Sequence, residues 1–218
     1  MNLKEIWSQV PPDYFSSGVT NSFLQNLWHT GKLMVVKQTL GENKLDTLVD
    51  VGSANGSFVN RLAQNGILCR RVLAVDPYFP PLKFGKKAYP KINFIQADAH
   101  LLPLKNSSVD AVIILETLEH VVDPYCTLLE LKRIIKPQGV IVVELDSNSL
   151  LFRLIWYFWK KLGAGKVWNH AHLTFFNVHL LEQLFLNAGL KIDKKIFFNL
   201  GMGVCFLLRK QKTIRSSG

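Results

Sequence analysis

The chain has 218 residues, 48% of them hydrophobic and 19% charged, so it can bury one sizeable core, and one domain is the expectation. The net charge is +10, with 15 Lys and Arg against 14 Asp and Glu in residues 1–149 and 11 against 2 in residues 150–218. This basic last third is compatible with an anionic partner, such as a lipid surface, an acidic substrate or nucleic acid. It is equally compatible with a basic face that only keeps the protein in solution.

The cysteines and the apolar segments indicate the compartment. The three cysteines lie far apart with no C-x-x-C pair, which argues against a zinc site and a disulfide framework: Cys69, Cys126 and Cys205. The first fifteen residues lack the basic start and apolar stretch of a secretory signal. Residues 149–163, the most apolar segment, contain Arg153 and are shorter than the roughly 20 residues that cross a bilayer. We expect a reduced, cytoplasmic protein.

Strand and helix signals alternate along the chain after an N-terminal region with helical stretches, residues 1–44. In chain order they predict a strand at 47–51, a helix at 57–64, a strand at 71–75, a helix at 81–89, strands at 92–96 and 109–115, a helix at 124–135, a strand at 140–145, a helix at 178–187 and two closing strands at 191–198 and 203–208. This βαβ alternation with short apolar strands predicts an α/β fold, doubly wound, with a mostly parallel sheet covered on both faces.

The first strand ends in a glycine-spaced turn, in the stretch LVDVGSANGSFVNRLA. Ligands of such sheets bind beyond the carboxyl ends of the strands. Gly52 and Gly56 let the backbone turn sharply and approach a ligand closely, and the helix that follows offers unpaired N–H groups. The alternative is a tight strand-to-helix turn that binds nothing.

Two aspartates follow the next two strands. Asp76, in LAVDPYF, is placed to accept both hydroxyls of a ribose, although taken alone it also suits a helix cap. Asp98, in IQADAHLL, could accept a hydrogen bond from an adenine amino group, with the Ala99 N–H on a ring nitrogen and Leu101 packed on the base. Three strand ends then describe one nucleoside site.

These residues resemble the class I S-adenosylmethionine-dependent methyltransferases, and within them the type-11 group that includes quinone-biosynthesis enzymes. The resemblance covers residues 45–147, in the blocks VDVGSANG, LAVDP, QADAHLLPLKNSSVDAVIILETLEHV and LKRIIKPQGVIVVE. It implies a Rossmann-like seven-stranded sheet with an antiparallel last strand. It departs from the family at Ala54, which stands where the family has the middle glycine of the first block; because alanine restricts the backbone, the affinity for the cofactor is in question.

The resemblance implies a function and a set of cofactor contacts. The cofactor is S-adenosyl-L-methionine, and the expected activity is methyl transfer to an O or C atom of a small acceptor. Asp50, Gly52, Ser53 and Gly56 are expected at the methionine end, Asp76 at the ribose, Asp98 and Ala99 at the adenine, and Glu116 close to the sulfonium. Residues 45–147 then form the cofactor-binding core of a single domain that spans residues 1–218.

Methyl transfer to oxygen or acidic carbon also needs a proton acceptor, for which histidine is the natural candidate. His120, in LETLEHV, stands just after the fourth strand and is the first catalytic candidate, although a histidine that only orders this loop would look the same. His170 and His172, in WNHAHLTFF, form the second set, with His172 as the candidate base. Two histidines at i, i+2 without a nearby carboxylate make a poor metal site, so we expect no metal. His100 is expected in the cofactor wall.

An aromatic and basic insert, residues 148–177, precedes the C-terminal helix and strands of residues 178–218. Its segment 150–162 combines five aromatic residues with Arg153, Lys160 and Lys161, which is typical of a helix at a membrane interface or of a lid over an apolar substrate. The alternative is a helix packed on the core or in a dimer interface. If this segment is a membrane-interface helix or a lid, we expect a lipophilic acceptor and peripheral contact of the protein with an anionic membrane surface.

Three other functions stay open. An RNA methyltransferase is suggested by the basic last third and its aromatics, although no RNA-binding appendage is visible and ILETLEHV stands where base-directed enzymes have N-P-P-[YF]. A nicotinamide-dependent oxidoreductase would also use Asp76 and a glycine turn, but GSANG lacks the G-x-G-x-x-G spacing. A homologue that binds the cofactor without turnover is the third.

Overall fold

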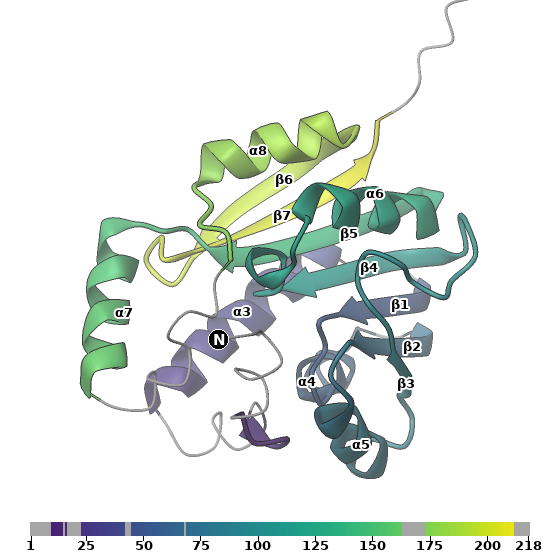
Figure 1. Cartoon of the computed structure of the whole chain (residues 1–218), viewed down its shortest axis with the longest axis horizontal. Helices are drawn as coiled ribbons and strands as arrows, with labels where there is room; N and C mark the ends of the chain where they lie inside the picture. The colour runs from purple at the N-terminus through teal and green to yellow at the C-terminus, as the bar shows by residue number, and fades with distance from the viewer. Residues whose placement is uncertain are drawn as a thin grey trace, which may run out of the picture.

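The structure is a computed structural model that describes residues 10–14, 16, 23–41, 45–67, 69–162 and 173–211. Seven strands form one sheet in the order β3-β2-β1-β4-β5-β7-β6 (Figure 1). The strands are β1 (Leu45–Val51), β2 (Cys69–Asp76), β3 (Asn93–Gln96), β4 (Val109–Leu115), β5 (Ile135–Asp146), β6 (Leu190–Phe198) and β7 (Gly203–Lys210). The pairs among β1 to β5 are parallel, and β7 runs antiparallel to both β5 and β6. The predicted fold class, with its antiparallel last strand, is confirmed.

Helices cover both faces of this sheet. The helices are α3 (Phe23–Leu40), α4 (Ser57–Gln64), α5 (Phe79–Ala88), α6 (Pro124–Ile134), α7 (Leu150–Leu162), α8 (Val178–Asn187) and a short 3-10 turn, η1 (Leu118–His120). Figure 1 shows α6 and α8 on one face and α3 and α4 on the other, with α7 at one end of the molecule. The core is divided by the sheet in the same way: Leu128 and Phe185 are buried on the first face, and Leu33 and Leu62 on the second.

Local sequence explains most of these elements. β1 and β4 are buried along nearly their whole length, as expected of central parallel strands covered on both faces. α6 begins where the Asp123 carboxylate accepts the N–H of Cys126 at 2.9 Å and Pro124 occupies the first turn. α8 begins at Asn177, whose side chain accepts the N–H of Leu180 at 2.9 Å. These caps fix the ends of the helices that cover the first face.

The largest error in the predicted boundaries is at the start of β5. The helix expected at 124–135 ends at Ile134, and the strand expected at 140–145 is β5, which already begins at Ile135. Pro137 and Gly139 lie in β5 where its register against β4 shifts, between the pairs Val109–Ile135 and Ala111–Val140. Proline is tolerated in a sheet at such irregularities, so these residues mark a bulge inside the strand and not a break before it.

Candidate active site

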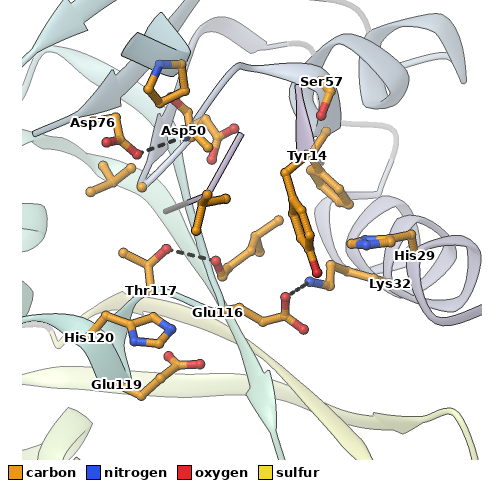
Figure 2. Close-up of a pocket in the computed structure, with 18 of the residues that line it drawn as sticks. Tyr14, His29, Lys32, Asp50, Ser57, Asp76, Glu116, Thr117, Glu119 and His120 are labelled. Atoms are coloured by element: carbon orange, nitrogen blue, oxygen red, sulfur yellow. Dashed lines mark hydrogen bonds and ion pairs between the residues drawn. The ribbon is translucent and has the colours of Figure 1, made fainter. Parts of the chain in front are cut away.

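A large cavity lies at the carboxyl ends of the central strands, where parallel α/β sheets bind their ligands. It has a volume of about 1490 Å³ and extends from the ends of β1, β2 and β3 to α3 and α7. Figure 2 shows its central part. Eight predicted site residues line it: Asp50, Gly52, Ser53, Asp76, Asp98, Ala99, Glu116 and His120. Among the described residues Gly56 and Leu101 are not part of this lining, and His170 and His172 lie outside the described ranges.

The turn after β1 has the shape of a ligand cradle. Gly52 has φ 77°, its N–H donates to the carbonyl of Val75 at 2.8 Å, and a Cβ there would overlap the Thr117 side chain. The Ser53 hydroxyl is buried and has no hydrogen-bond partner within the described chain. Ala54 also takes a positive φ, 48°, so the left-handed turn forms without a glycine at this position. A bare backbone beside an unpartnered hydroxyl suits a polar ligand.

Gly56 serves packing. It has φ 72° and caps α4, and a Cβ there would come within 2.8 Å of the Phe94 ring. Gly56 lies between the turn and β3, where a larger side chain would meet Phe94. A glycine is therefore needed at this position although it does not line the cavity.

Asp76 joins the turn to the end of β2. One carboxylate oxygen accepts the N–H of Ala54 at 2.9 Å and the other accepts the N–H of Tyr78 at 2.8 Å. Burial raises the pKa of Asp76 to about 6 against the effect of these two donors. Since each carboxylate oxygen keeps a free lone pair, Asp76 can still accept hydroxyl groups from the cavity.

Asp98 and His100 form a small network after β3. Oδ1 of Asp98 accepts the backbone N–H of His100 at 2.9 Å and lies 2.5 Å from its Nδ1, while Nε2 of His100 accepts the N–H of Asp123 at 3.1 Å. Nδ1 therefore carries the proton in the neutral ring. The donors from His100, chiefly its backbone N–H, lower the pKa of Asp98. His100 thus ties the loop after β3 to α6, and Oδ2 of Asp98 is the oxygen left for a ligand.

The N-terminal segment covers the turn, which sequence reasoning missed. The Asn55 amide donates to the carbonyl of Pro12 at 3.1 Å and its oxygen accepts the N–H of Ser57 at 3.1 Å. Tyr14 follows on the same segment, and its ring points into the cavity toward Lys32 in Figure 2. No motif in the sequence marks this contact.

A buried lysine joins α3 to the ends of β4 and β5. Nζ of Lys32 lies 2.5 Å from Glu116 and 3.5 Å from Glu144, and the Lys32 and Glu144 side chains are 4% and 0% exposed. The Trp28 indole N–H donates to the other Glu116 oxygen at 2.7 Å. Figure 2 shows Lys32 and His29 reaching into the cavity from the same helix. Sequence analysis placed Glu116 here but missed Lys32, Glu144 and Trp28, because no motif marks the helix that carries two of them.

Charge and burial shift these groups in different directions. Burial opposes ionisation of Glu116, but the Lys32 ammonium outweighs it and lowers the pKa. Burial raises the pKa of Glu144, with Lys32 opposing and Glu116 adding. Burial also raises the pKa of Asp50 to about 7, with Asp76 adding, and lowers that of His29 to about 4. The end of β4 and β5 therefore holds more carboxyl groups than Lys32 alone can neutralise.

Two further carboxyl groups border this region. Glu119, in η1, is buried, and its Oε2 has no hydrogen-bond partner in the described part of the chain. Burial raises its pKa well above the usual range and raises that of Asp146 to about 6. The Glu119 carbonyl accepts the N–H groups of Leu173 and Thr174, so the chain before α8 is fixed to η1. His120 follows Glu119 and lines the same cavity.

Aromatic side chains form the outer wall of the cavity. Trp28 of α3 packs against Phe198 and Phe152 with ring centroids 5.6 and 6.1 Å apart, and Phe152 stacks on Trp156 at 5.6 Å. Three of the four line the cavity, namely Trp28, Phe152 and Trp156. The aromatic residues predicted at 150–162 thus lie on α7, beside the site.

Comparison with known proteins finds similarity to methyltransferases. Residues 49–143 match the family model described as a methyltransferase domain. A demethylmenaquinone methyltransferase of Renibacterium salmoninarum is 33% identical over 143 residues, which cover 66% of this chain and 58% of that protein. Residues 49–143 are therefore similar to a methyltransferase domain, and the relatives support the class I S-adenosylmethionine-dependent methyltransferases.

Further comparisons agree. A ubiquinone biosynthesis O-methyltransferase of Saccharophagus degradans is 29% identical over 67% of this chain and 64% of that protein, so the chain spans about three fifths of the length of these methyltransferases. A solved methyltransferase of Thermotoga maritima, described as a possible histamine N-methyltransferase, superposes with a TM-score of 0.72 at 21% identity over 96% of this chain and 100% of that one. At that identity the likeness shows the methyltransferase fold.

The residues present fit the cofactor of this family, S-adenosylmethionine. The unpartnered Ser53 hydroxyl, the cradle at Gly52 and the acceptors Asp76 and Asp98 follow three neighbouring strands and face one cavity. No group of three or more His, Cys, Asp or Glu side chains within the described ranges could hold a metal ion. None of the helices in those ranges has the length and apolar character that a bilayer span requires.

Proposed function

We propose that this chain is an S-adenosylmethionine-dependent methyltransferase whose acceptor is a small lipophilic molecule, methylated on an oxygen or carbon atom. The observation that carries the proposal is the cavity, which continues from the acidic strand ends to the aromatic wall of Trp28, Phe152 and Trp156. Its volume of about 1490 Å³ exceeds the roughly 300–1,000 Å³ of a site for one small ligand. This space suits a polar cofactor and an apolar acceptor together.

The methyl donor supplies an activated methyl group when bound. In the proposed mechanism Asp76 accepts the ribose hydroxyls, Oδ2 of Asp98 accepts the adenine amino group, and the Ala99 N–H donates to the ring. Gly52 and Ser53 hold the methionine end with Asp50, and Glu116 faces the sulfonium side. The aromatic wall holds the acceptor ring in one orientation, since positioning can supply about 7–11 kcal/mol of barrier lowering.

His120 is proposed as the proton acceptor for the hydroxyl or acidic C–H of the acceptor. It lines the cavity next to the carboxyl group of Glu119, and Figure 2 places both on the wall that also carries Thr117. His120→Ala should lower kcat at least about 100-fold and leave the cofactor affinity unchanged. An unchanged kcat would assign His120 to loop structure. His172, the other predicted base, remains a proposal on sequence alone.

The test of the function is transfer of tritiated methyl from labelled S-adenosylmethionine to an acceptor panel of prenylated phenols, quinols and naphthols, with total RNA and a soluble catechol as further arms. Label is expected in the organic extract from a lipophilic acceptor, and Asp76→Ala should abolish it. The printed names of the quinone-related relatives support this choice of panel. Label in RNA or in the soluble catechol alone would contradict the lipophilic acceptor.

We also propose that the cavity mouth docks on an anionic membrane surface. Large apolar side chains surround it with high exposure: Leu154 at 55%, Phe158 at 50% and Leu200, at the tip of the β6–β7 hairpin, at 89%. Arg153 and Lys161 are exposed on the same helix, α7. An apolar surface with basic residues matches the interface of an anionic bilayer.

Flotation with vesicles of phosphatidylglycerol and phosphatidylcholine tests this docking. The wild-type protein should float, and Leu154→Asp with Leu200→Asp should remain at the bottom. Leu186→Asp is the matched control, because Leu186 is 54% exposed on α8, outside the cavity lining. The docking would be overturned if the wild-type protein did not float, or if the control variant alone failed to float.

A further inference from the structure

The carboxyl groups of Glu116, which is partly buried, and Glu144, which is fully buried, compete for one ammonium group. Lys32 lies 2.5 Å from the first and 3.5 Å from the second, and neither oxygen of Glu144 has a hydrogen-bond partner among the described residues. The backbone also joins the two, because the Glu116 N–H donates to the Glu144 carbonyl at 2.8 Å. Lys32 balances one negative charge, and a second buried negative charge here costs several kcal/mol unless a further cation balances it. Without such a cation, the pair of carboxyl groups holds a proton.

The position of this pair relative to the cofactor site follows from the sheet. The ends of β2, β1 and β4 are neighbours, so Asp76 and Glu116 are separated by two strand spacings, roughly 10 Å. Thr117, next to Glu116, packs against Gly52 of the turn. A ligand with its ribose at Asp76 that runs along the turn therefore brings its far end to Glu116, whose side chain is 31% exposed and lines the cavity.

The other charged groups around the pair leave it as the responsive element. From α3 come Lys32 and His29, whose ring is held neutral by burial; from η1 comes Glu119; and from the end of β5 comes Asp146. Cys205 of β7 pairs with Glu144 in the sheet, and burial keeps its thiol protonated by raising its pKa to about 12. Asp50 and Asp76 face the parts of the ligand that the methyl donor and its demethylated product share.

We propose that the Glu116–Glu144 pair senses the charge of the sulfonium: it holds a proton when the neutral product occupies the site and releases it when the cationic methyl donor does. The inference rests on the proposed function. The donor and S-adenosylhomocysteine differ only in the methyl group and the charge on sulfur, so any difference in proton uptake between them reports on groups near the sulfur. The pocket then keeps nearly the same total charge before and after the reaction, and the product is bound without an uncompensated carboxylate.

Calorimetric titration in two buffers of the same pH and different ionisation enthalpy, phosphate and Tris near neutral pH, measures the protons released on binding. Near neutral pH, S-adenosylmethionine should release at least about 0.3 proton more than S-adenosylhomocysteine, and the ratio of their two Kd values should change with pH by the matching slope. The difference should disappear at pH 5 and pH 10, where the pair is in one state throughout.

Two variants assign the effect. Glu144→Gln mimics the neutral, protonated side chain and should remove the difference in proton release while both compounds still bind. Glu182→Gln, on the exposed surface of α8 where it pairs with Lys195 at 2.7 Å, should retain it. Equal proton release in the wild type, a pH-independent difference, or a difference that survives Glu144→Gln would overturn the inference. Failure of both compounds to bind would overturn the proposed function as well, so the two outcomes are distinguishable.

Discussion

At the scale of single residues, the turn after β1 shows two different demands on neighbouring positions. Gly52 and Ala54 both have a positive φ, and at Gly52 an added Cβ would also overlap the Thr117 side chain. The turn was predicted from its glycines, and Ala54 placed the affinity for the cofactor in question. At Ala54 the structure shows the strained backbone directly, whereas the requirement at Gly52 combines strain with a contact from a residue 65 positions away, which no local pattern reveals.

Gly52→Ala should therefore destabilise the protein by about 2 kcal/mol or more and weaken cofactor binding, because the new Cβ overlaps Thr117. Ala54→Gly is the matched control and should stay within about 1 kcal/mol of the wild type, since relief of strain offsets the greater freedom of the unfolded chain. Urea unfolding measures both. A Gly52→Ala protein of wild-type stability would contradict the packing of this turn.

Asp76 makes cofactor binding depend on pH. Its pKa in the folded protein is about 6 and its charged form is the better acceptor for hydroxyls, so the affinity should fall as the pH drops through 6. S-adenosylhomocysteine is the suitable probe because it lacks the sulfonium charge. Asp76→Asn should bind it at least about tenfold more weakly at pH 7.5, a loss of about 1.4 kcal/mol, and should lose this pH step. A step of the same size in the variant would exclude Asp76 as its source.

At the scale of elements, sequence reasoning succeeded where the signal is local. The bounds of α4, β4 and α8 are as predicted, because each is an apolar run or an amphipathic pattern that ends at a cap or a turn. It failed at the start of β5, where the pairing with β4 keeps Pro137 inside the sheet. It also gave no role to α3, whose Lys32 meets Glu116 84 positions further on. A long-range ion pair of this kind has no signature in a single sequence.

The docking of α3 depends on that ion pair. Lys32→Met should cost about 3 kcal/mol, because it removes the ammonium group that balances the carboxyl groups of Glu116 and Glu144. Lys32→Met combined with Glu116→Gln should recover part of the loss, and Lys37→Met on the exposed side of α3 should change the stability by no more than about 0.5 kcal/mol. Equal losses for Lys32→Met and Lys37→Met, measured by urea unfolding, would contradict this role.

At the scale of the whole molecule, the fold was predictable from the βαβ alternation and the family resemblance, whereas the charge balance of the cavity was not. Net charge pointed to the last third of the chain, yet its two acidic residues form ion pairs with three of its basic ones: Asp193 with Lys191 and Arg209, and Glu182 with Lys195. The charge balance of the cavity is set instead by buried acidic side chains from distant parts of the sequence. Topology brings them together, so composition cannot report them.

These acids make stability depend on pH. Burial raises the pKa of Asp50 to about 7 and also raises that of Glu144, so the folded state holds protons that the unfolded chain has lost. That contribution is present below the unfolded pKa and disappears as the pH rises through the folded one. His29, with a folded pKa of about 4, has the opposite effect only below about pH 6.5, where the unfolded ring is charged.

From pH 6.5 to 8 the cofactor-free protein should therefore lose about 1 kcal/mol and about 2–4 °C in Tm. Scanning calorimetry across this range measures the loss, and Asp50→Asn should reduce it. A Tm that rises over the same interval would mean that these carboxyl groups are not buried as described.

The central claim is that the ends of β1, β2 and β3 bind S-adenosylmethionine, and parallel calorimetric titrations with S-adenosylmethionine, S-adenosylhomocysteine and NADH test it most directly. The wild type should bind both adenosyl compounds and not NADH, and Asp76→Ala should weaken both at least about tenfold, which corresponds to about 1.4 kcal/mol. Binding of NADH alone, or adenosyl binding that Asp76→Ala leaves unchanged, would contradict the account.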